Sequence, residues 1–317
     1  MRGLWLDAAG ARLRDDLAPP LEGPGEVLVD VLCAGVCATD LALGRGYMDF
    51  EGVPGHEFVG RARTGRLAGQ RVVGEINAGC GTCELCRSGD PRHCASRTVL
   101  GILGRPGAFA ETMSLPEANL YPVPESVPDE AAVFTEPLAA ACALLEALPD
   151  LAHGTPAVVV GDGRLGLLCA LVLQRAGALV TVLGRHPERV ERLPSLRWGT
   201  ARPGQRWPIV VEATGAVDGP QRALDLVEVK GTLLLKTTME APAALDLARL
   251  VVDEIRLVGS RCGRFQDALD LLASGAVDPT PLLDAELLLD QAPEALARAA
   301  QPGTLKVLIR NAAAAPS

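Results

Sequence analysis

The sequence predicts an α/β protein of two domains, one of which is built on a doubly wound parallel sheet. Its length of 317 residues exceeds that of a usual single domain. A glycine-rich turn stands between an apolar run and a helix-like stretch within residues 156–185. Further short apolar runs follow at intervals, which is the pattern of alternating strands and helices.

The glycine-rich turn indicates a dinucleotide-binding unit. The valine-rich run at 157–160 fits a buried parallel strand, the stretch at 164–176 fits a helix ended by Gly177, and 179–183 fits the next strand. In this context the glycines allow a tight turn and let the backbone approach a pyrophosphate at the helix N-terminus. A glycine-rich turn of another α/β fold is the alternative. The candidate coenzyme-binding residues of the turn are Gly161, Gly163, Arg164, Leu165 and Gly166.

Later segments extend the same sheet and close the chain. Strands are expected at 208–215, 231–238 and 255–260, with a helix at 220–227. A helix at 265–275 and a closing strand at 304–310 follow, and the last residues, 311–317, are expected to be frayed.

The end of the second strand bears on the choice of coenzyme. NAD sites usually carry an acid about 20 residues into the unit. Here Gly184 and Arg185 stand in that place, and Arg189 follows. Loss of the acid and gain of a cation both favour a 2′-phosphate, so the sequence favours NADP over NAD. The alternative is that these arginines form a solvated helix start.

Composition excludes several function classes. The net charge is −9 and the basic residues form no block, which argues against nucleic-acid binding. No apolar run reaches the roughly 18 residues of a membrane helix, and charged residues interrupt the N-terminal stretch where a signal peptide would be apolar. A cytoplasmic protein is therefore expected, in which nine cysteines indicate metal binding or catalysis rather than disulfides.

Four cysteines lie in one glycine-rich loop at 80–94. Spacings of three, three and eight residues suit a tetrahedral thiolate site for zinc, and four protein ligands leave no open position, so the site is expected to be structural. An iron–sulfur cluster is the rival, but ferredoxin runs continue with a closer cysteine followed by proline. The candidate ligands are Cys80, Cys83, Cys86 and Cys94.

A second ligand set is spread along the chain. Cys37 lies in LCAGVCATD, His56 and Glu57 lie in GVPGHEFVGR, and Glu136 lies in FTEPLAA. Cysteine, histidine and carboxylate are the ligand types of a catalytic zinc that keeps one position open.

Together, the segments GVCATD, GHEFVG, the four-cysteine loop, EPLAA and GDGRLG resemble the zinc-containing medium-chain dehydrogenase/reductase family, the alcohol and polyol dehydrogenases. The resemblance covers nearly the whole chain in the family's order. It implies a mainly β, GroES-like catalytic domain at 1–137, a Rossmann coenzyme domain at 138–262, and a return to the catalytic domain at 263–317.

The resemblance also implies roles for single residues. Cys37 and His56 become catalytic zinc ligands, and Glu57, Glu136 or both supply the carboxylate. Thr39 begins a proton relay and Asp40 orients the zinc-bound histidine. The family's second relay residue, a histidine, is replaced by Ala42.

The activity implied is hydride transfer between an alcohol or polyol, or its carbonyl counterpart, and NAD(P), with one catalytic and one structural zinc per chain. A homodimer or homotetramer without nucleic-acid or membrane partners is implied as well. Two alternatives remain: a zinc-free quinone- or enone-reductase-like enzyme, and a relative that binds coenzyme without catalysis.

Overall fold

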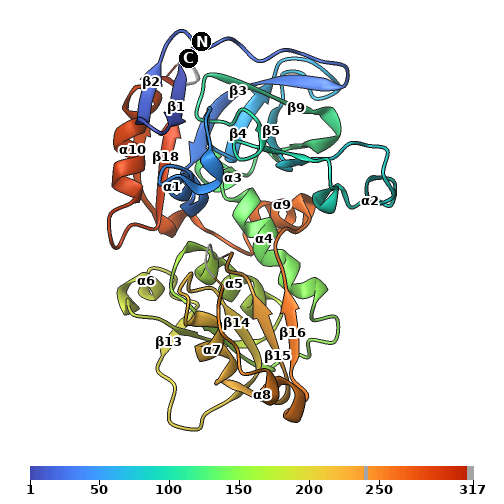
Figure 1. Cartoon of the computed structure of the whole chain (residues 1–317), viewed down its shortest axis with the longest axis vertical. Coiled ribbons are helices and arrows are strands. Elements are labelled where there is room, and N and C mark those ends of the chain that lie inside the picture. Colours follow the sequence, from blue (N-terminus) through green and yellow to red (C-terminus); the bar gives the residue numbers. More distant parts are fainter. Residues whose placement is uncertain (239–241, 313–317) are drawn as a thin grey trace. The chain divides into compact units, whose positions relative to one another are not determined.

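The computed structural model describes residues 1–238 and 242–312, which form two compact units (Figure 1). One unit comprises Met1–Glu136 and the segment from Leu283 onward, and the other comprises Pro137–Leu282. The class is the one expected: a mainly β first unit and a parallel α/β sheet in the second. No helix within the described residues is both long and apolar enough to cross a membrane.

The first unit is built on a seven-stranded sheet in which β10, β5, β4, β3, β18 and β17 follow one another and β9 also pairs with β3. In β3 the buried residues Val27, Val29 and Val31 alternate with more exposed ones, and from Leu32 onward every residue is buried. The strands are β3 (Glu26–Gly35), β4 (Glu57–Ala62), β5 (Arg71–Gly74), β9 (Thr112–Pro116), β10 (Leu120–Pro122), β17 (Leu283–Leu288) and β18 (Lys306–Arg310).

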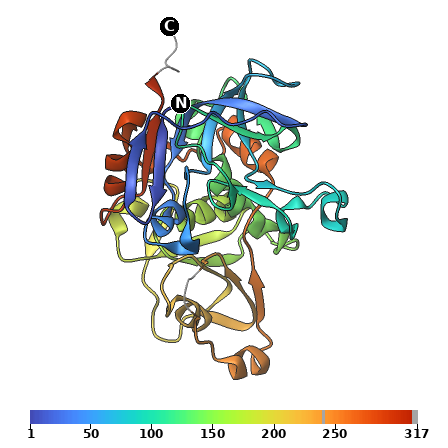
Figure 2. The same ribbon diagram turned by 45° about the horizontal axis from the view of Figure 1, so that its top comes forward.

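The last strand completes the sheet of the first unit. β18 pairs antiparallel with the end of β3, so that segments from opposite ends of the chain lie side by side (Figures 1 and 2). The expected fraying does not begin at 311, because Asn311 is buried and its side chain donates hydrogen bonds to the carbonyl oxygens of Val31 and Ala110 at 2.7 and 3.1 Å. Of the predicted frayed tail, residues 313–317 lie outside the described part of the chain.

Smaller elements surround this sheet. β1 and β2 form a hairpin whose Leu4 belongs to the hydrophobic core of the unit. β6, β7 and β8 form a three-stranded sheet, with β6 before and β7 and β8 after the cysteine loop in the sequence. Their bounds are β1 (Gly3–Asp7), β2 (Gly10–Arg14), β6 (Asn77–Ala78), β7 (Thr98–Leu100) and β8 (Gly104–Arg105). The helices are α1 (Ala38–Leu43), α2 (Glu84–Arg87), α3 (Asp129–Ala132), α10 (Ala292–Ala299) and α4 (Thr135–Glu146), which continues into the second unit.

The second unit holds a six-stranded, all-parallel sheet in the order β13-β12-β11-β14-β15-β16. The chain leaves β11 toward one side and later returns to its other side, which creates the switch point where nucleotides bind in such folds. The strands are β11 (Pro156–Val160), β12 (Leu179–Leu183), β13 (Arg197–Gly199), β14 (Trp207–Glu212), β15 (Val227–Leu235) and β16 (Arg256–Gly259). The helices are α5 (Arg164–Arg175), α6 (Pro187–Glu191), α7 (Gly219–Leu224), α8 (Leu247–Val252) and α9 (Phe265–Ala273).

Three features of the second unit differ from the expectation. β15 begins at Val227 rather than 231 and α7 ends at Leu224, because Val227 is fully buried and pairs with Trp207. The short β13 was missed, since two of its three residues are exposed. The unit also extends to Leu282 instead of 262: a Cβ on Gly263 would lie 1.9 Å from the carbonyl oxygen of Ala139, so the chain after β16 packs directly on α4.

Candidate functional site

The carboxylate of Asp40 holds together the segments that carry Cys37 and His56. Cys37 precedes the first turn of α1, and its backbone N–H donates to Oδ2 of Asp40 at 2.8 Å. Oδ1 accepts the backbone N–H of Gly55 at 3.2 Å and lies 3.3 Å from Nδ1 of His56. Because Nδ1 faces the carboxylate, the other ring nitrogen of His56 remains available as a ligand.

Glu57 begins β4 next to His56 and forms a buried ion pair. Its Oε2 accepts a hydrogen bond from Nζ of Lys306, the first residue of β18, and both side chains are almost fully buried. The ammonium group also lies 5.3 Å from the centre of the Phe134 ring. The carboxylate is thus neutralised within the protein, and the C-terminal strand is part of the site.

Gly35 leaves the space that this pair occupies. Gly35 stands opposite Glu57 in the pairing of β3 with β4. A Cβ at this position would lie 2.6 Å from Oε2 of Glu57 and 3.2 Å from Nζ of Lys306. A side chain at residue 35 would therefore displace the ion pair.

Two titratable groups respond to this environment. Burial alone would lower the pKa of His56, but the carboxylate of Asp40 and the Cys37 side chain outweigh it and raise the pKa well above its usual range. Burial raises the pKa of Glu136, in the first turn of α4, to about 7, and the negative charge of Glu57 adds to the effect. Asp40 and Cys37 thus favour a positive charge at the position of His56, whereas burial disfavours a negative charge on Glu136.

The ligand atoms of Cys37, His56 and Glu57 all lie within 4.8 Å of one another. Sulfur, imidazole nitrogen and carboxylate oxygen in this proximity fit a zinc ion with an open position. Glu136 is outside this group but close enough for Glu57 and His56 to affect its pKa. The Thr39 hydroxyl lies 4.0 Å from Sγ of Cys37, at the edge of the same group.

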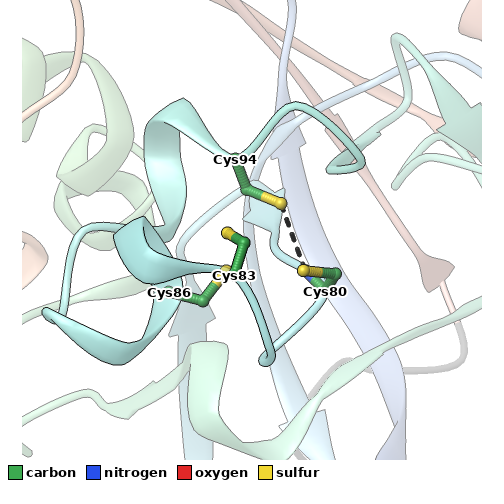
Figure 3. Close-up of side chains that lie close together, drawn as sticks. All are labelled: Cys80, Cys83, Cys86 and Cys94. Atoms are coloured by element: carbon green, nitrogen blue, oxygen red, sulfur yellow. Dashed lines mark hydrogen bonds between the residues drawn. The ribbon is translucent and has the colours of Figure 1, made fainter.

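The four loop cysteines form a second group. Their sulfur atoms also lie within 4.8 Å of one another, and Figure 3 shows the four side chains converging. The backbone N–H of Cys80 donates to Sγ of Cys94 at 3.4 Å, and a hydrogen bond from Thr82 helps lower the pKa of Cys80 to about 5, which favours the thiolate. A set of four thiolates fits a closed, structural zinc site.

The glycine-rich turn of the second unit has the geometry of a dinucleotide cradle. Gly161 has a φ of 125°, and a Cβ there would lie 2.4 Å from the carbonyl oxygen of Ala213. A Cβ on Gly166 would lie 2.2 Å from the carbonyl oxygen of Gly161, whereas one on Gly163 would meet open space. Gly161 and Gly166 therefore allow the close backbone contacts within the turn, and Gly163 leaves the outer side of the turn clear for a ligand. Arg164 and Leu165 form the first turn of α5.

The structure adds a carboxylate beside the arginines expected at the adenosine end of the turn. Asp162 is buried within the turn, and its Oδ2 accepts the backbone N–H of His186 at 2.5 Å. Nη1 of Arg189 lies 3.5 Å from Oδ1 of Asp162, while Arg185 is exposed. The carboxylate of Asp162, which was not predicted from the sequence, therefore lies beside Arg189 and the backbone of residue 186.

Lys306 and Asp162 are the two residues that sequence reasoning missed. A lysine within the otherwise apolar strand pattern LKVLI was a usable signal, because such a residue requires a buried partner. The acid between the first two glycines of GDGRLG was the other signal.

The chain is similar to known proteins both in sequence and in structure. Residues 23–125 match the alcohol dehydrogenase GroES-like domain family. L-threonine 3-dehydrogenase from Chelativorans sp. (strain BNC1) is 38% identical over 194 residues, which are 57% of this chain and 53% of that protein. The match to these curated relatives thus spans about half of their length.

Solved structures match along nearly the whole chain. An alcohol dehydrogenase from Thermus sp. ATN1 is 29% identical with a TM-score of 0.89, over 98% of this chain and 100% of that one. Galactitol-1-phosphate dehydrogenase from Escherichia coli is 23% identical with a TM-score of 0.86 over 98% and 100% of the two chains, a likeness that concerns the fold.

Replacement of Lys306 tests the buried ion pair. Lys306→Met is expected to destabilise the first unit by about 3–5 kcal/mol, because it leaves the Glu57 charge buried without its partner. The double variant Glu57→Gln, Lys306→Met should recover much of this loss. Thermal and denaturant unfolding measure both effects.

The control for this prediction is Lys230→Met, which removes an exposed ion pair to Glu254. It should change stability by less than about 1 kcal/mol. Equal effects of the buried and the exposed substitution would contradict the importance of the Glu57–Lys306 pair.

Proposed function

We propose that the chain is a member of the zinc-containing medium-chain dehydrogenase/reductase family and that it is a zinc-dependent oxidoreductase. It transfers a hydride between an alcohol or polyol, or the matching carbonyl compound, and a nicotinamide coenzyme. The observation that carries the proposal is the proximity of Cys37, His56 and Glu57, whose ligand atoms lie within 4.8 Å of one another in addition to the separate four-thiol group. A zinc-free reductase would have no need of this first set.

In this proposal Cys37 and His56 hold the catalytic zinc. The carboxylate ligand is Glu57, which has one oxygen on Lys306, or Glu136, in the first turn of α4, or both. Zinc bound there supplies Lewis acidity, which favours ionisation of an alcohol and polarises a carbonyl.

The surrounding residues orient the ligands and move the proton. Asp40 fixes the ring of His56 through Nδ1, so that Nε2 faces the metal position. Thr39 holds a proton at Oγ1, 4.0 Å from Sγ of Cys37, and begins the relay. Since Ala42 replaces the usual relay histidine, the proton leaves by water or through Glu57.

The four loop thiolates hold a structural zinc and fix the fold of residues 80–94. The glycine turn, with Gly161, Gly163, Arg164, Leu165 and Gly166, binds the coenzyme pyrophosphate at the N-terminus of α5. The coenzyme supplies the hydride acceptor or donor. Arg185 and Arg189 by themselves favour NADP, whereas the buried Asp162 beside them opposes it.

We expect a small-molecule substrate with a CH–OH group and a homodimer or homotetramer, as in the family. Free thiols in two ligand sets are maintained in a reducing compartment, which fits the cytoplasm.

Metal content is the direct test of the two ligand sets. The purified protein is expected to hold about two zinc ions per chain, and Cys37→Ser about one, because serine is a poor zinc ligand. Elemental mass spectrometry for zinc and iron measures this. Cys262→Ser, outside both sets, serves as the matched control and should retain both ions.

The same proteins are then assayed with alcohols, polyols and L-threonine in the presence of NAD or NADP. Turnover that is lost in Cys37→Ser and kept in Cys262→Ser supports the proposal. One zinc in both the natural protein and Cys37→Ser would leave the catalytic set vacant and favour a zinc-free reductase or a coenzyme-binding relative. Iron in place of zinc would indicate that the four loop cysteines hold an iron–sulfur cluster.

The glycine turn gives a further prediction. Gly163→Ala adds a methyl group that meets open space within the protein, so unfolding should be unchanged while NADH binding weakens by about tenfold or more. Gly166→Ala forces a contact with Gly161 and should also lower the unfolding midpoint. Fluorescence titration measures the NADH affinity of each variant, and thermal unfolding measures its stability. Unchanged NADH affinity in Gly163→Ala would argue against the assigned site.

A further inference from the structure

The second unit lacks an acid at the place where dinucleotide-binding folds usually carry one. In such folds an Asp or Glu at the end of the second strand accepts a hydrogen bond from the adenosine ribose. Here β12 ends at Leu183, and Gly184 and Arg185 follow. From sequence alone, the end of this strand therefore carries a cation where the acid is usually found.

The structure places a carboxylate in the same corner from a different segment. A Cβ on Gly184 would lie 2.4 Å from both Cγ and Oδ2 of Asp162, so the Asp162 side chain fills the space that a side chain at 184 would require. The carboxyl group is held in place, because Oδ2 accepts the backbone N–H of His186 at 2.5 Å. A glycine at 184 is therefore what admits the acid from the turn.

The second carboxylate oxygen is only loosely engaged. Oδ1 lies 3.5 Å from Nη1 of Arg189, which is long for a hydrogen bond. Nε of Arg189 is buried and makes no hydrogen bond. Oδ1 can therefore accept a further donor. Arg189, one of the two arginines that the sequence assigned to a 2′-phosphate, already lies beside a negative charge.

We propose that Asp162 takes the place of the missing acid: Oδ1 accepts a hydrogen bond from the adenosine ribose, and the chain prefers NAD to NADP. The inference rests on the proposed function, because it concerns the coenzyme of that reaction. Since Asp162 is buried within the turn, a 2′-phosphate near it would be repelled with little screening by water. Arg185 is exposed, so water and salt screen its attraction for a phosphate.

Coenzyme binding provides a test that needs no substrate. The exposed Trp198 donates its ring N–H to the carbonyl oxygen of Gly184 at 3.4 Å, so its fluorescence reports on this corner. NADH and NADPH are titrated separately, following tryptophan quenching and coenzyme emission. The natural protein is expected to bind NADH about tenfold more tightly than NADPH, as the gain of a charge-assisted hydrogen bond implies.

Asp162→Asn keeps an oxygen for the His186 N–H but removes the charge. It should lower the NADH-to-NADPH preference by about tenfold, mainly through tighter NADPH binding. Glu188→Gln removes an exposed charge from the same segment and should leave the preference within about twofold. The pair Asp162→Gly, Gly184→Asp returns the acid to the strand end and should restore a preference for NADH.

The outcomes separate this inference from the function on which it rests. Tighter binding of NADPH by the natural protein, or an unchanged preference in Asp162→Asn, would overturn the role of Asp162 while leaving the dehydrogenase proposal in place. Failure of both coenzymes to bind the natural protein would overturn the proposed function, and this inference with it.

Discussion

The buried carboxylate of Asp40 is the interaction on which the candidate metal site depends. Its two oxygens accept the backbone N–H groups of Cys37 and Gly55, and one of them faces Nδ1 of His56. A fully buried anion requires such partners, since an unsatisfied charge there would be costly. By meeting this requirement, Asp40 brings together two ligands that are 19 residues apart in the sequence.

The ion pair of Glu57 and Lys306 extends this constraint to the end of the chain. β18 inserts beside β3, so its first residue reaches a carboxylate that is 249 residues earlier. The pair fits only because residue 35 has no side chain. The first unit therefore needs its C-terminal segment to complete the surroundings of Cys37, His56 and Glu57.

The sequence best predicted those features whose residues lie close together in the chain. The four loop cysteines and the glycine turn are close in sequence, and their spacing restricts the geometry; the parallel sheet and the mainly β unit were predicted correctly. Cys37, His56 and Glu57 were chosen by ligand type, and the structure brings their ligand atoms within 4.8 Å. Their roles remain predictions.

The features that the sequence did not predict depend on contacts between residues that are far apart in the chain. Lys306 acquires its partner only through long-range strand pairing, and Asp162 gains its position because a distant glycine leaves room for it. The extent of the second unit depended on close packing of Gly263 against α4, which no local pattern indicates. The start of β15 was misplaced because burial of Val227 overrode its helix-like context.

X-ray absorption at the zinc edge shows whether zinc is bound at Cys37, His56 and a carboxylate as well as by the four loop thiolates, because it identifies the atoms bound to the metal. We expect an average shell with sulfur at about 2.3 Å and a distinct contribution of nitrogen or oxygen at about 2.0–2.1 Å, reduced in Cys37→Ser to sulfur alone. A shell of sulfur only in the natural protein would contradict it, since zinc would then occupy the four-thiol loop and leave Cys37, His56 and Glu57 without a metal.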